Sequence, residues 1–213
     1  MSRMLVAVVL ALSMGGCQLD MWNDPYPASD EGKNILYSVF TERPKHLDPV
    51  QSYSENEAVF NAQIYEPPLQ YHYFKRPYTL IPQAAAEMPQ PQYYDAQGNK
   101  LPQETGAKDA AFSVYEIRIK HGVMYQPHPC FAKDANGKPL YQDLKPGALD
   151  DIYTLSDFKQ TGARELSAAD YVYQIKRLAH PRLHSPIFGL LSDYIVGMKE
   201  YAATLKQAND ELV

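Results

Sequence analysis

The clearest pattern of apolar and polar positions lies in residues 166–180. Val172, Ile175, Leu178 and Ala179 recur there at steps of three and four residues. This spacing places the four side chains on one face of an α-helix. We therefore predict an amphipathic helix that packs this face against the protein core, with Ile175 buried in the middle of the apolar stripe.

Signals for a beginning and an end flank this predicted helix. Ser167 and Asp170 have the spacing of a capping box, with Asp in place of the usual Glu or Gln. Lys176 and Arg177 lie near the C-terminal end, where the helix dipole favours positive charge. Pro181 cannot continue a helix, so we expect the helix to end before it.

Two further helices are predicted from similar signals. Ser54 and Glu57 have capping-box spacing, and Pro67 and Pro68 follow as an end signal. The apolar face of this helix should comprise Ala58, Val59, Ala62 and Tyr65. Residues 197–212 also have helical composition. Their apolar face should comprise Met198, Tyr201, Ala202 and Leu205.

Strand patterns occur in two places. Residues 35–40, Ile-Leu-Tyr-Ser-Val-Phe, have strand composition. In residues 112–123, Tyr115, Ile117 and Ile119 alternate with charged residues, which is the period of a half-buried strand. Residues 95–99, Asp-Ala-Gln-Gly-Asn, predict a turn. Helices and strands together indicate a mixed α/β fold of the α+β kind.

Residues 125–165 are a long stretch rich in Pro and Gly. A connection of that length is uncommon unless it is functional or has structure of its own. We interpret it as a surface insertion with at most a short hairpin around Asn136–Gly137.

The N-terminus has the features of a secretion signal. Met4–Met14 is an apolar run of eleven residues, which fits a signal peptide and is shorter than the ~20 residues that span a bilayer. Met14-Gly15-Gly16-Cys17 then resembles a lipobox. We predict a lipoprotein signal peptide over residues 1–17 with a lipid attached to Cys17, the alternative being an ordinary signal with a coincidental Cys. Residues 18–33 should form a polar, flexible tether, and residues 34–213 the folded domain.

Composition narrows the class of protein. A hydrophobic fraction of 45% fits a globular protein with a core. The net charge of -5 gives no reason to expect a nucleic acid partner, which requires a basic surface. The high count of 17 Tyr suits half-wet clefts as well as surface loops. Cys130, with no partner once Cys17 is lipidated, is expected to be a small buried hydrophobe.

Catalytic and metal-binding patterns are weak. Ser156 and Lys159 have the Ser-x-x-Lys spacing of penicillin-interactive enzymes, but the partner motifs Ser-Asp-Asn and Lys-Thr-Gly do not occur. His121, His128 and Cys130 lack the spacing of a metal site. No Walker loop is present. We therefore expect neither an enzyme nor a metal or other cofactor.

The sequence of residues 166–180 resembles a segment of the family 5 extracellular solute-binding proteins that reads Thr-Ala-Glu-Asp-Val-Val-Tyr-Ser-hydrophobic-Lys-Arg. These proteins are the oligopeptide- and dipeptide-binding components of bacterial ABC importers. Other segments resemble segments of these proteins and follow in the same order along the chain. They are Leu47-Asp48-Pro49, Tyr65-Glu66-Pro67-Pro68-Leu69, residues 81–87, residues 112–123, Ser185-Pro186 and Ile195-Val196-Gly197-Met198. Pro67-Pro68 departs from the family, whose turn reads Tyr-Glu-Gly-Leu.

The resemblance implies a fold of two lobes that close around an extended peptide. The similar segments correspond to the N-terminal part of the first lobe, and the second lobe is expected to be absent from these residues. The implied function is capture of oligopeptides in the periplasm for an ABC permease and its ATPase, with the protein held on the envelope membrane by the lipid on Cys17. In the family the end of the first strand lies beside the peptide, which transfers to Phe40, Thr41 and Glu42 as ligand-binding candidates.

Two other classes stay open at this point. The first is a lipoprotein that binds a protein or cell-wall partner through the insertion at residues 125–165. The second is a secreted hydrolase that uses Ser156.

Overall fold

The computed structural model describes residues 25–211, and the chain divides into two units, Met1–Thr41 and Glu42–Val213. The predicted apolar run Met4–Met14, the lipobox Cys17 and the first part of the tether lie outside the described residues. None of the helices within residues 25–211 combines the length and the apolar character that crossing a membrane requires.

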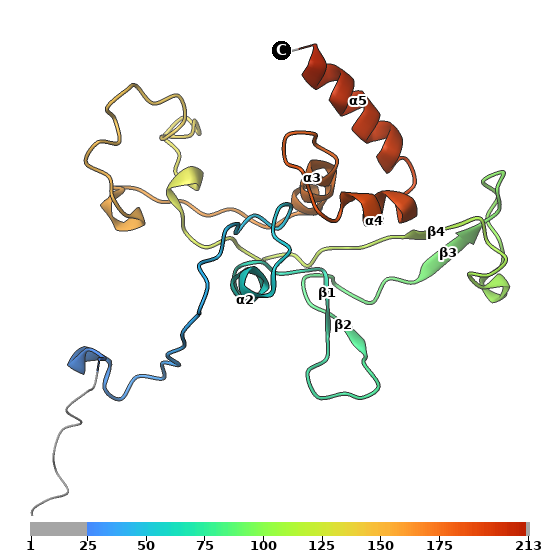
Figure 1. The fold of residues 1–213 in the computed structure, drawn as a ribbon, viewed down its shortest axis with the longest axis horizontal. Coiled ribbons are helices and arrows are strands. Elements are labelled where there is room, and N and C mark those ends of the chain that lie inside the picture. Colours follow the sequence, from blue (N-terminus) through green and yellow to red (C-terminus); the bar gives the residue numbers. More distant parts are fainter. Residues whose placement is uncertain (1–24, 212–213) are drawn as a thin grey trace, which may run out of the picture. The chain divides into compact units, whose positions relative to one another are not determined.

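The described part is a mixed α/β fold with four α-helices and two small antiparallel sheets (Figure 1). The helices are α2 (Glu55–Ile64), α3 (Ala168–Leu178), α4 (Phe188–Tyr194) and α5 (Met198–Asp210). The strands are β1 (Leu69–Tyr71), β2 (Leu80–Pro82), β3 (Pro91–Tyr94) and β4 (Phe112–Tyr115). Short 3-10 helices are η2 (Ala28–Asp30), η3 (Gln103–Thr105), η4 (Pro129–Phe131) and η5 (Leu155–Asp157).

The described residues of the first unit are organised around Asp30. Its carboxylate accepts hydrogen bonds from the Tyr37 hydroxyl at 2.6 Å and from the Lys33 ammonium at 3.0 Å. The Tyr26 and Tyr37 rings stack with their centroids 3.7 Å apart. These contacts join η2 to the chain that follows it.

Residues 35–40 do not form the predicted strand. Their side chains are exposed, Leu36 to 93% and Val39 to 91%. Strand composition is realised only where a second strand supplies backbone partners. Within the described residues, the strands of both sheets come from the second unit.

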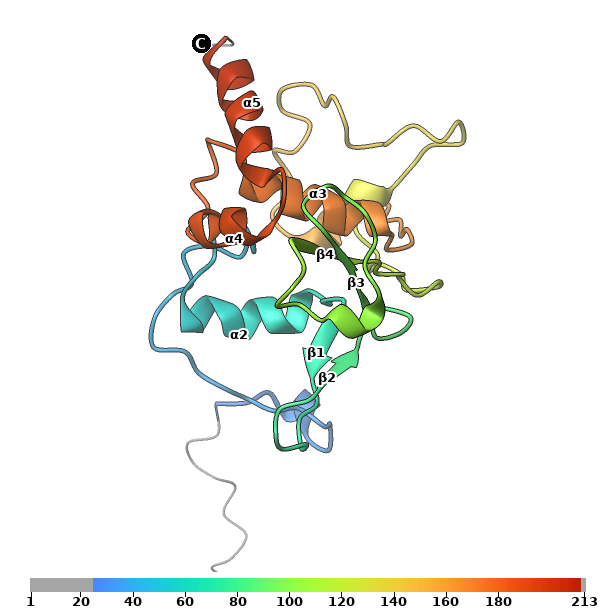
Figure 2. The ribbon, with the colours of Figure 1, turned by 90° about the vertical axis from the view of Figure 1, so that its right-hand side faces the viewer.

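The core of the second unit lies among α3, α4, α5 and the loop before α2 (Figure 2). Its buried residues are Val50, Leu178, Ala179 and Met198. The partly buried side chains packed against them are Leu183, Ile187, Phe188, Leu191, Tyr201, Ala202 and Leu205. The predicted apolar face of α5 is therefore confirmed.

The predicted ends of α3 are also confirmed. The Ser167 N–H and hydroxyl donate to the Asp170 carboxylate at 2.8 and 3.0 Å, which completes the capping box. The Arg164 guanidinium binds the same carboxylate. Its hydrogen bond, with those from Ser167, outweighs desolvation and lowers the Asp170 pKa to about 2. The helix ends at Leu178, before Pro181.

The predicted burial of Ile175 is wrong. Leu178 and Ala179 lie in the core, but Val172 and Ile175 are 50% and 45% exposed. Only the C-terminal turn of α3 reaches the core around Met198, so the apolar stripe continues beyond the region that packing covers.

Helix α2 has the predicted capping box between Ser54 and Glu57, and it ends before Pro67. Its predicted apolar face is wrong, because Ala58, Val59, Ala62 and Tyr65 are exposed. The buried side chain of α2 is instead Glu57. Polar contacts with the preceding loop, described below, therefore hold this helix.

The two sheets are hairpins. Strand β1 pairs with β2 from Leu69 opposite Pro82, and β3 pairs with β4 from Pro91 opposite Tyr115. The predicted turn at residues 95–99 is confirmed, and the Asp95 carboxylate accepts hydrogen bonds from N–H groups within it.

The predicted strand at residues 112–123 is shorter than expected. Strand β4 ends at Tyr115, and Ile119 makes only an isolated bridge to Ala85. Tyr115 and Ile117 are exposed, contrary to the half-buried pattern. The alternation specifies two faces of a strand, but the buried face also needs an element to cover it.

Residues 125–165 form a long excursion that is closed at its base. Bridges join Met124 to Glu165 and His128 to Gly162, and a short turn follows Asp134 as predicted. A Cβ at position 162 would lie 2.3 Å from the Phe131 carbonyl oxygen, so this closure requires Gly. Cys130 is exposed, contrary to the expectation of a buried thiol, whereas its neighbours Pro129 and Ala132 are buried.

Candidate functional site

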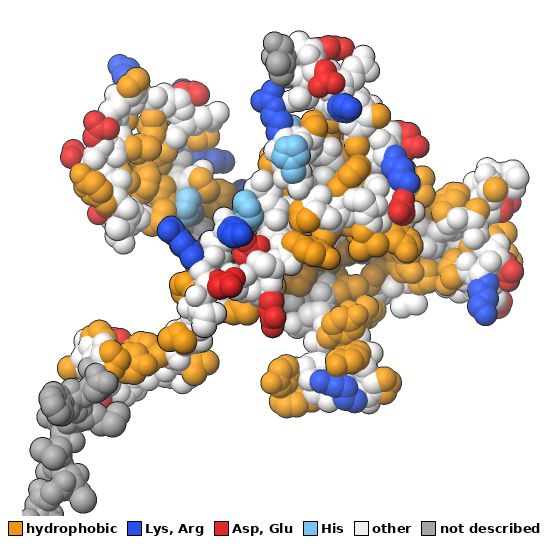
Figure 3. Space-filling model, in the orientation of Figure 1, with side chains coloured by type: hydrophobic (Ala, Val, Ile, Leu, Met, Phe, Trp, Pro, Cys, Tyr) orange, Lys and Arg blue, Asp and Glu red, His pale blue; other side chains and the backbone are white. Residues whose placement is uncertain are grey.

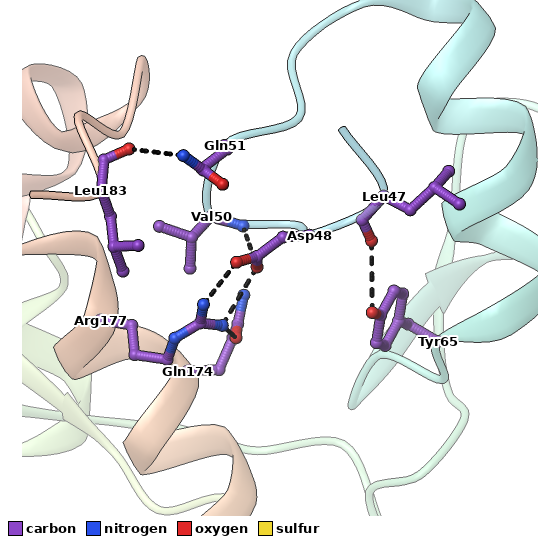
Figure 4. A network of polar contacts seen from close by, with 8 residues as sticks. All are labelled: Leu47, Asp48, Val50, Gln51, Tyr65, Gln174, Arg177 and Leu183. Carbon is purple, nitrogen blue, oxygen red and sulfur yellow. Dashed lines mark hydrogen bonds and ion pairs between the residues drawn. The ribbon is translucent and has the colours of Figure 1, made fainter. Parts of the chain in front are cut away.

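The loop between residues 47 and 51 is bound to the end of α3 by an ion pair (Figure 4). The Arg177 guanidinium donates to both carboxylate oxygens of Asp48, with Nη1 3.0 Å from Oδ1. Arg177 Nη1 also donates to the Gln174 side chain at 3.1 Å. Both charged side chains are about one quarter exposed, so the pair is only partly screened by water.

The carboxyl of Asp48 is held in its charged form. Its partial burial raises its pKa, but hydrogen bonds from Arg177 and from the Val50 N–H, with the charge of Arg177, lower the pKa below its ordinary value overall. Val50 itself is fully buried. The same five-residue loop therefore supplies a core side chain and one half of an ion pair.

Further bonds hold the loop on both sides. The Gln51 side chain donates to the Leu183 carbonyl at 3.2 Å. The Tyr65 hydroxyl, at the end of α2, donates to the Leu47 carbonyl at 3.2 Å. Figure 4 shows these contacts around the loop, which thus connects α2 with the segment after α3.

Glu57 fixes the residues just before this loop. Its Oε1 accepts hydrogen bonds from the Lys45 and His46 N–H groups at 3.0 and 2.8 Å, and its Oε2 accepts from the Tyr53 and Ser54 N–H groups. The side chain is 3% exposed. The hydrogen bond from the His46 N–H has the largest effect on the pKa of Glu57. Together with the bonds from Ser54 and Tyr53 it outweighs desolvation, which raises the pKa, and lowers the pKa to about 2.

A hollow of about 350 Å³ lies beside these contacts and is open to solvent. Its lining residues are Lys45, His46, Gln51, Tyr53, Ser54, Glu57, His184 and Pro186. The negative charge of the Glu57 carboxylate also faces this region, and its oxygens accept hydrogen bonds from backbone N–H groups. Lys45, His46 and His184 also line the hollow, and their side chains can donate hydrogen bonds to a carboxylate or phosphate.

The structure places the predicted ligand-binding residues on exposed chain. Phe40 is 59% exposed, and Thr41 and Glu42 are also exposed. The Glu42 carbonyl accepts a hydrogen bond from the Asn56 side chain at 3.3 Å, which ties it to the start of α2. Phe40 and Thr41 belong to the first unit and Glu42 to the second.

The hollow was not predicted from the sequence. His184 is far from Lys45 and His46 along the chain, and no spacing pattern links them. The sequence feature nearest to the hollow is the Leu47-Asp48-Pro49 segment, which follows His46 directly.

The candidate catalytic and metal-binding residues lie elsewhere. Ser156 is exposed in η5, where the Asp157 carboxylate caps the turn through the Thr154 N–H. The His128 ring accepts a hydrogen bond from the Cys130 N–H, and His121 lies 3.6 Å from Glu165. Within residues 25–211, no three His, Cys, Asp or Glu side chains are arranged to hold a metal ion.

Comparison with known proteins found no family model, no curated protein and no solved structure that matches this chain.

Proposed function

We propose that residues 34–213 form the N-terminal part of the first lobe of a peptide-capturing, solute-binding protein of an ABC importer. The observation that carries this proposal is the ion pair between Asp48 and Arg177. It joins Leu47-Asp48-Pro49 to the Lys-Arg end of α3, two of the segments that resemble family 5 solute-binding proteins. Two segments whose sequences resemble the family therefore also contact each other in the fold.

The exposed apolar stripe on α3 adds support. Val172 and Ile175 continue the helical spacing of the buried Leu178, yet about half of each side chain remains in water. Tyr115 and Ile117 are likewise exposed at strand spacing. Burying such surface is favourable at about 25 cal/mol per Å², so these positions suit a fold in which further chain covers them.

The hollow beside the Asp48 loop suits one end of a peptide. Lys45, His46 and His184 can donate to a terminal carboxylate. An open hollow leaves a ligand largely hydrated, whereas solute sites usually bury most of their ligand. In the proposal, a second lobe closes over the peptide and completes the site.

The proposal includes the cellular setting predicted from the sequence. The lipid on Cys17 anchors the protein to the envelope membrane, residues 18–33 act as the tether, and the folded part works in the periplasm. The ABC permease and its ATPase accept the peptide. The protein itself performs no catalysis in this scheme.

The test uses the protein extended along its gene past Val213. Addition of short peptides should change its tyrosine fluorescence, and Lys45→Ala should weaken the response. The wild type and Lys45→Ala should give equal fluorescence responses to peptides with an amidated C-terminus, because these peptides lack the terminal carboxylate. Lys159→Ala, at an exposed site in the insertion, is the matched control. A gene whose continuation lacks the family pattern, or an extended protein that ignores peptides, would contradict the proposal.

A second candidate function is a lipoprotein module that binds a cell-wall or protein partner through residues 125–165. Tyr153 and Leu155 favour it, because they are 84% and 59% exposed on this excursion. Sedimentation with purified cell-wall sacculi tests the cell-wall form. The module predicts co-sedimentation that is lost in Tyr153→Ser with Leu155→Ser, whereas the receptor predicts no effect of these substitutions.

A further inference from the structure

The loop that connects β1 and β2 gathers aromatic side chains at one exposed tip. We define the aromatic tip as residues 71–78, Tyr-His-Tyr-Phe-Lys-Arg-Pro-Tyr. Its four Tyr and Phe rings are all well exposed: Tyr71 65%, Tyr73 81%, Phe74 81% and Tyr78 72%. Figure 3 shows the corresponding surface as orange side chains around blue ones.

The aromatic tip has an ordered backbone. The His72 Nδ1 accepts hydrogen bonds from the Phe74 and Lys75 N–H groups at 3.2 and 3.3 Å. The Arg76 guanidinium donates to the Tyr73 and Lys75 carbonyls at 3.2 and 2.9 Å. Side chains of the tip thus satisfy its own backbone polar groups. The Tyr71 and Tyr78 rings also meet edge to face across the hairpin, with their centroids 5.9 Å apart.

The charge of the aromatic tip is opposite to that of the protein. Lys75 and Arg76 are positive, and residues 67–86 contain no Asp or Glu, whereas the whole chain has a net charge of -5. The Arg76 guanidinium lies 4.5 Å from the centre of the Tyr78 ring. Cation and ring therefore form one continuous surface.

We propose that the aromatic tip inserts into the surface of a membrane that contains anionic lipids. Tyr rings have an apolar body and a polar end, which suits the boundary between headgroups and acyl chains. Phe74 supplies a purely apolar group beside them, and Lys75 can keep its charge at the headgroups while its stem is buried. Each cation near an anionic surface strengthens binding about five-fold.

The composition of the aromatic tip favours lipid over a carbohydrate partner. Sugar hydroxyls donate as well as accept hydrogen bonds, and the side chains that accept through a carboxylate or amide oxygen are Asp, Glu, Asn and Gln. Residues 71–78 contain none of these. None of residues 71–78 lines the hollow proposed for the peptide, so the aromatic tip is a separate surface.

The experiment measures insertion at a single position. The full chain with Cys17→Ser and Cys130→Ser carries an environment-sensitive fluorophore on Phe74→Cys, or on Tyr153→Cys as the matched control. Vesicles of phosphatidylethanolamine with phosphatidylglycerol are compared with vesicles of phosphatidylcholine alone. Both labelled proteins share the apolar run Met4–Met14, so a difference between them reports the aromatic tip.

The proposal predicts a blue shift of the label at position 74 with the anionic vesicles, and little or no shift at position 153. Adding Lys75→Glu to the labelled protein should weaken vesicle affinity by about five-fold or more. No shift at position 74, equal shifts at both positions, or equal shifts with both kinds of vesicle would overturn the proposal. A tip that contacts another protein would give the first of these results.

Discussion

Arg177 and Asp48 are 129 residues apart in the sequence, and they form a two-pronged ion pair in the fold. The pair fixes the loop that carries the buried Val50 against the last turn of α3. Loop position and core packing at this point therefore depend on the same contact.

Breaking this ion pair should destabilise the protein. Arg177→Met leaves the Asp48 carboxylate partly buried without its partner, which should cost about 1–3 kcal/mol of unfolding free energy. Asp48→Asn with Arg177→Met should cost less than the sum of the single substitutions, because the orphaned charge is then removed. Urea unfolding of the two single variants and the double variant measures this coupling.

The control for this cycle is the pair between Lys199 and Asp193, whose side chains are more than half exposed. Lys199→Met should cost about 0–1 kcal/mol. Equal costs for Lys199→Met and Arg177→Met would show that the contact with Asp48 adds nothing to stability.

The stripe on α3 gives a second prediction. Leu178→Ala should cost about 2–4 kcal/mol because Leu178 lies in the core. Ile175→Asp should cost less than about 1 kcal/mol in this chain, since Ile175 is 45% exposed. In the protein extended past Val213, Ile175→Asp should become costly as further chain covers the stripe. Thermal unfolding of both proteins measures the change, and an unchanged small cost would count against a covering segment.

Sequence patterns predicted the features of this fold that depend on neighbouring residues. Both capping boxes, at Ser54 and at Ser167, are present, because cap and helix lie within one turn. The apolar face of α5 beginning at Met198 also packs as expected. By contrast, periodicity placed Ile175 on an apolar face without showing that only the end of α3 reaches the core.

Contacts between distant segments could not be read from the sequence. The prediction of a strand at residues 35–40 is wrong, because a strand needs a partner strand and the composition of one segment does not reveal a partner. The hollow brings His184 beside Lys45, and only the folded path of the chain does this. The carboxylate of Glu57 was predicted as a helix cap, and its bonds to the preceding loop were missed.

Glu57 should make stability depend on pH. Its pKa is about 2 in the folded protein against an ordinary 4.5, so the folded state favours the charged carboxylate. Its contribution is complete above about pH 4.5 and is lost as pH falls from there toward 2. Glu57→Gln should therefore lower stability at neutral pH and flatten its decline in acid.

Unfolding measured across this pH range checks the prediction. Glu55→Gln is the matched control, because Glu55 is exposed in the same first turn of α2. An identical acid dependence in Glu57→Gln and Glu55→Gln would show that the hydrogen bonds to Glu57 do not favour its charged form.

The lipobox gives a prediction for living cells. A palmitate analogue should label the wild-type protein, and Cys17→Ala should abolish the label because the acceptor thiol is lost. Cys130→Ala should leave the label unchanged, which controls for modification of the exposed thiol. Persistent labelling of Cys17→Ala would rule out the predicted anchor.

The most direct test of the receptor proposal is calorimetry with a mixed library of short peptides. We predict no micromolar binding by the 213-residue chain, because the hollow by the Asp48 loop is open to solvent and leaves a peptide largely hydrated. The protein extended along its gene past Val213 should bind the same library with a measurable heat. Micromolar binding by the 213-residue chain alone, or no binding by the extended protein, would contradict the account.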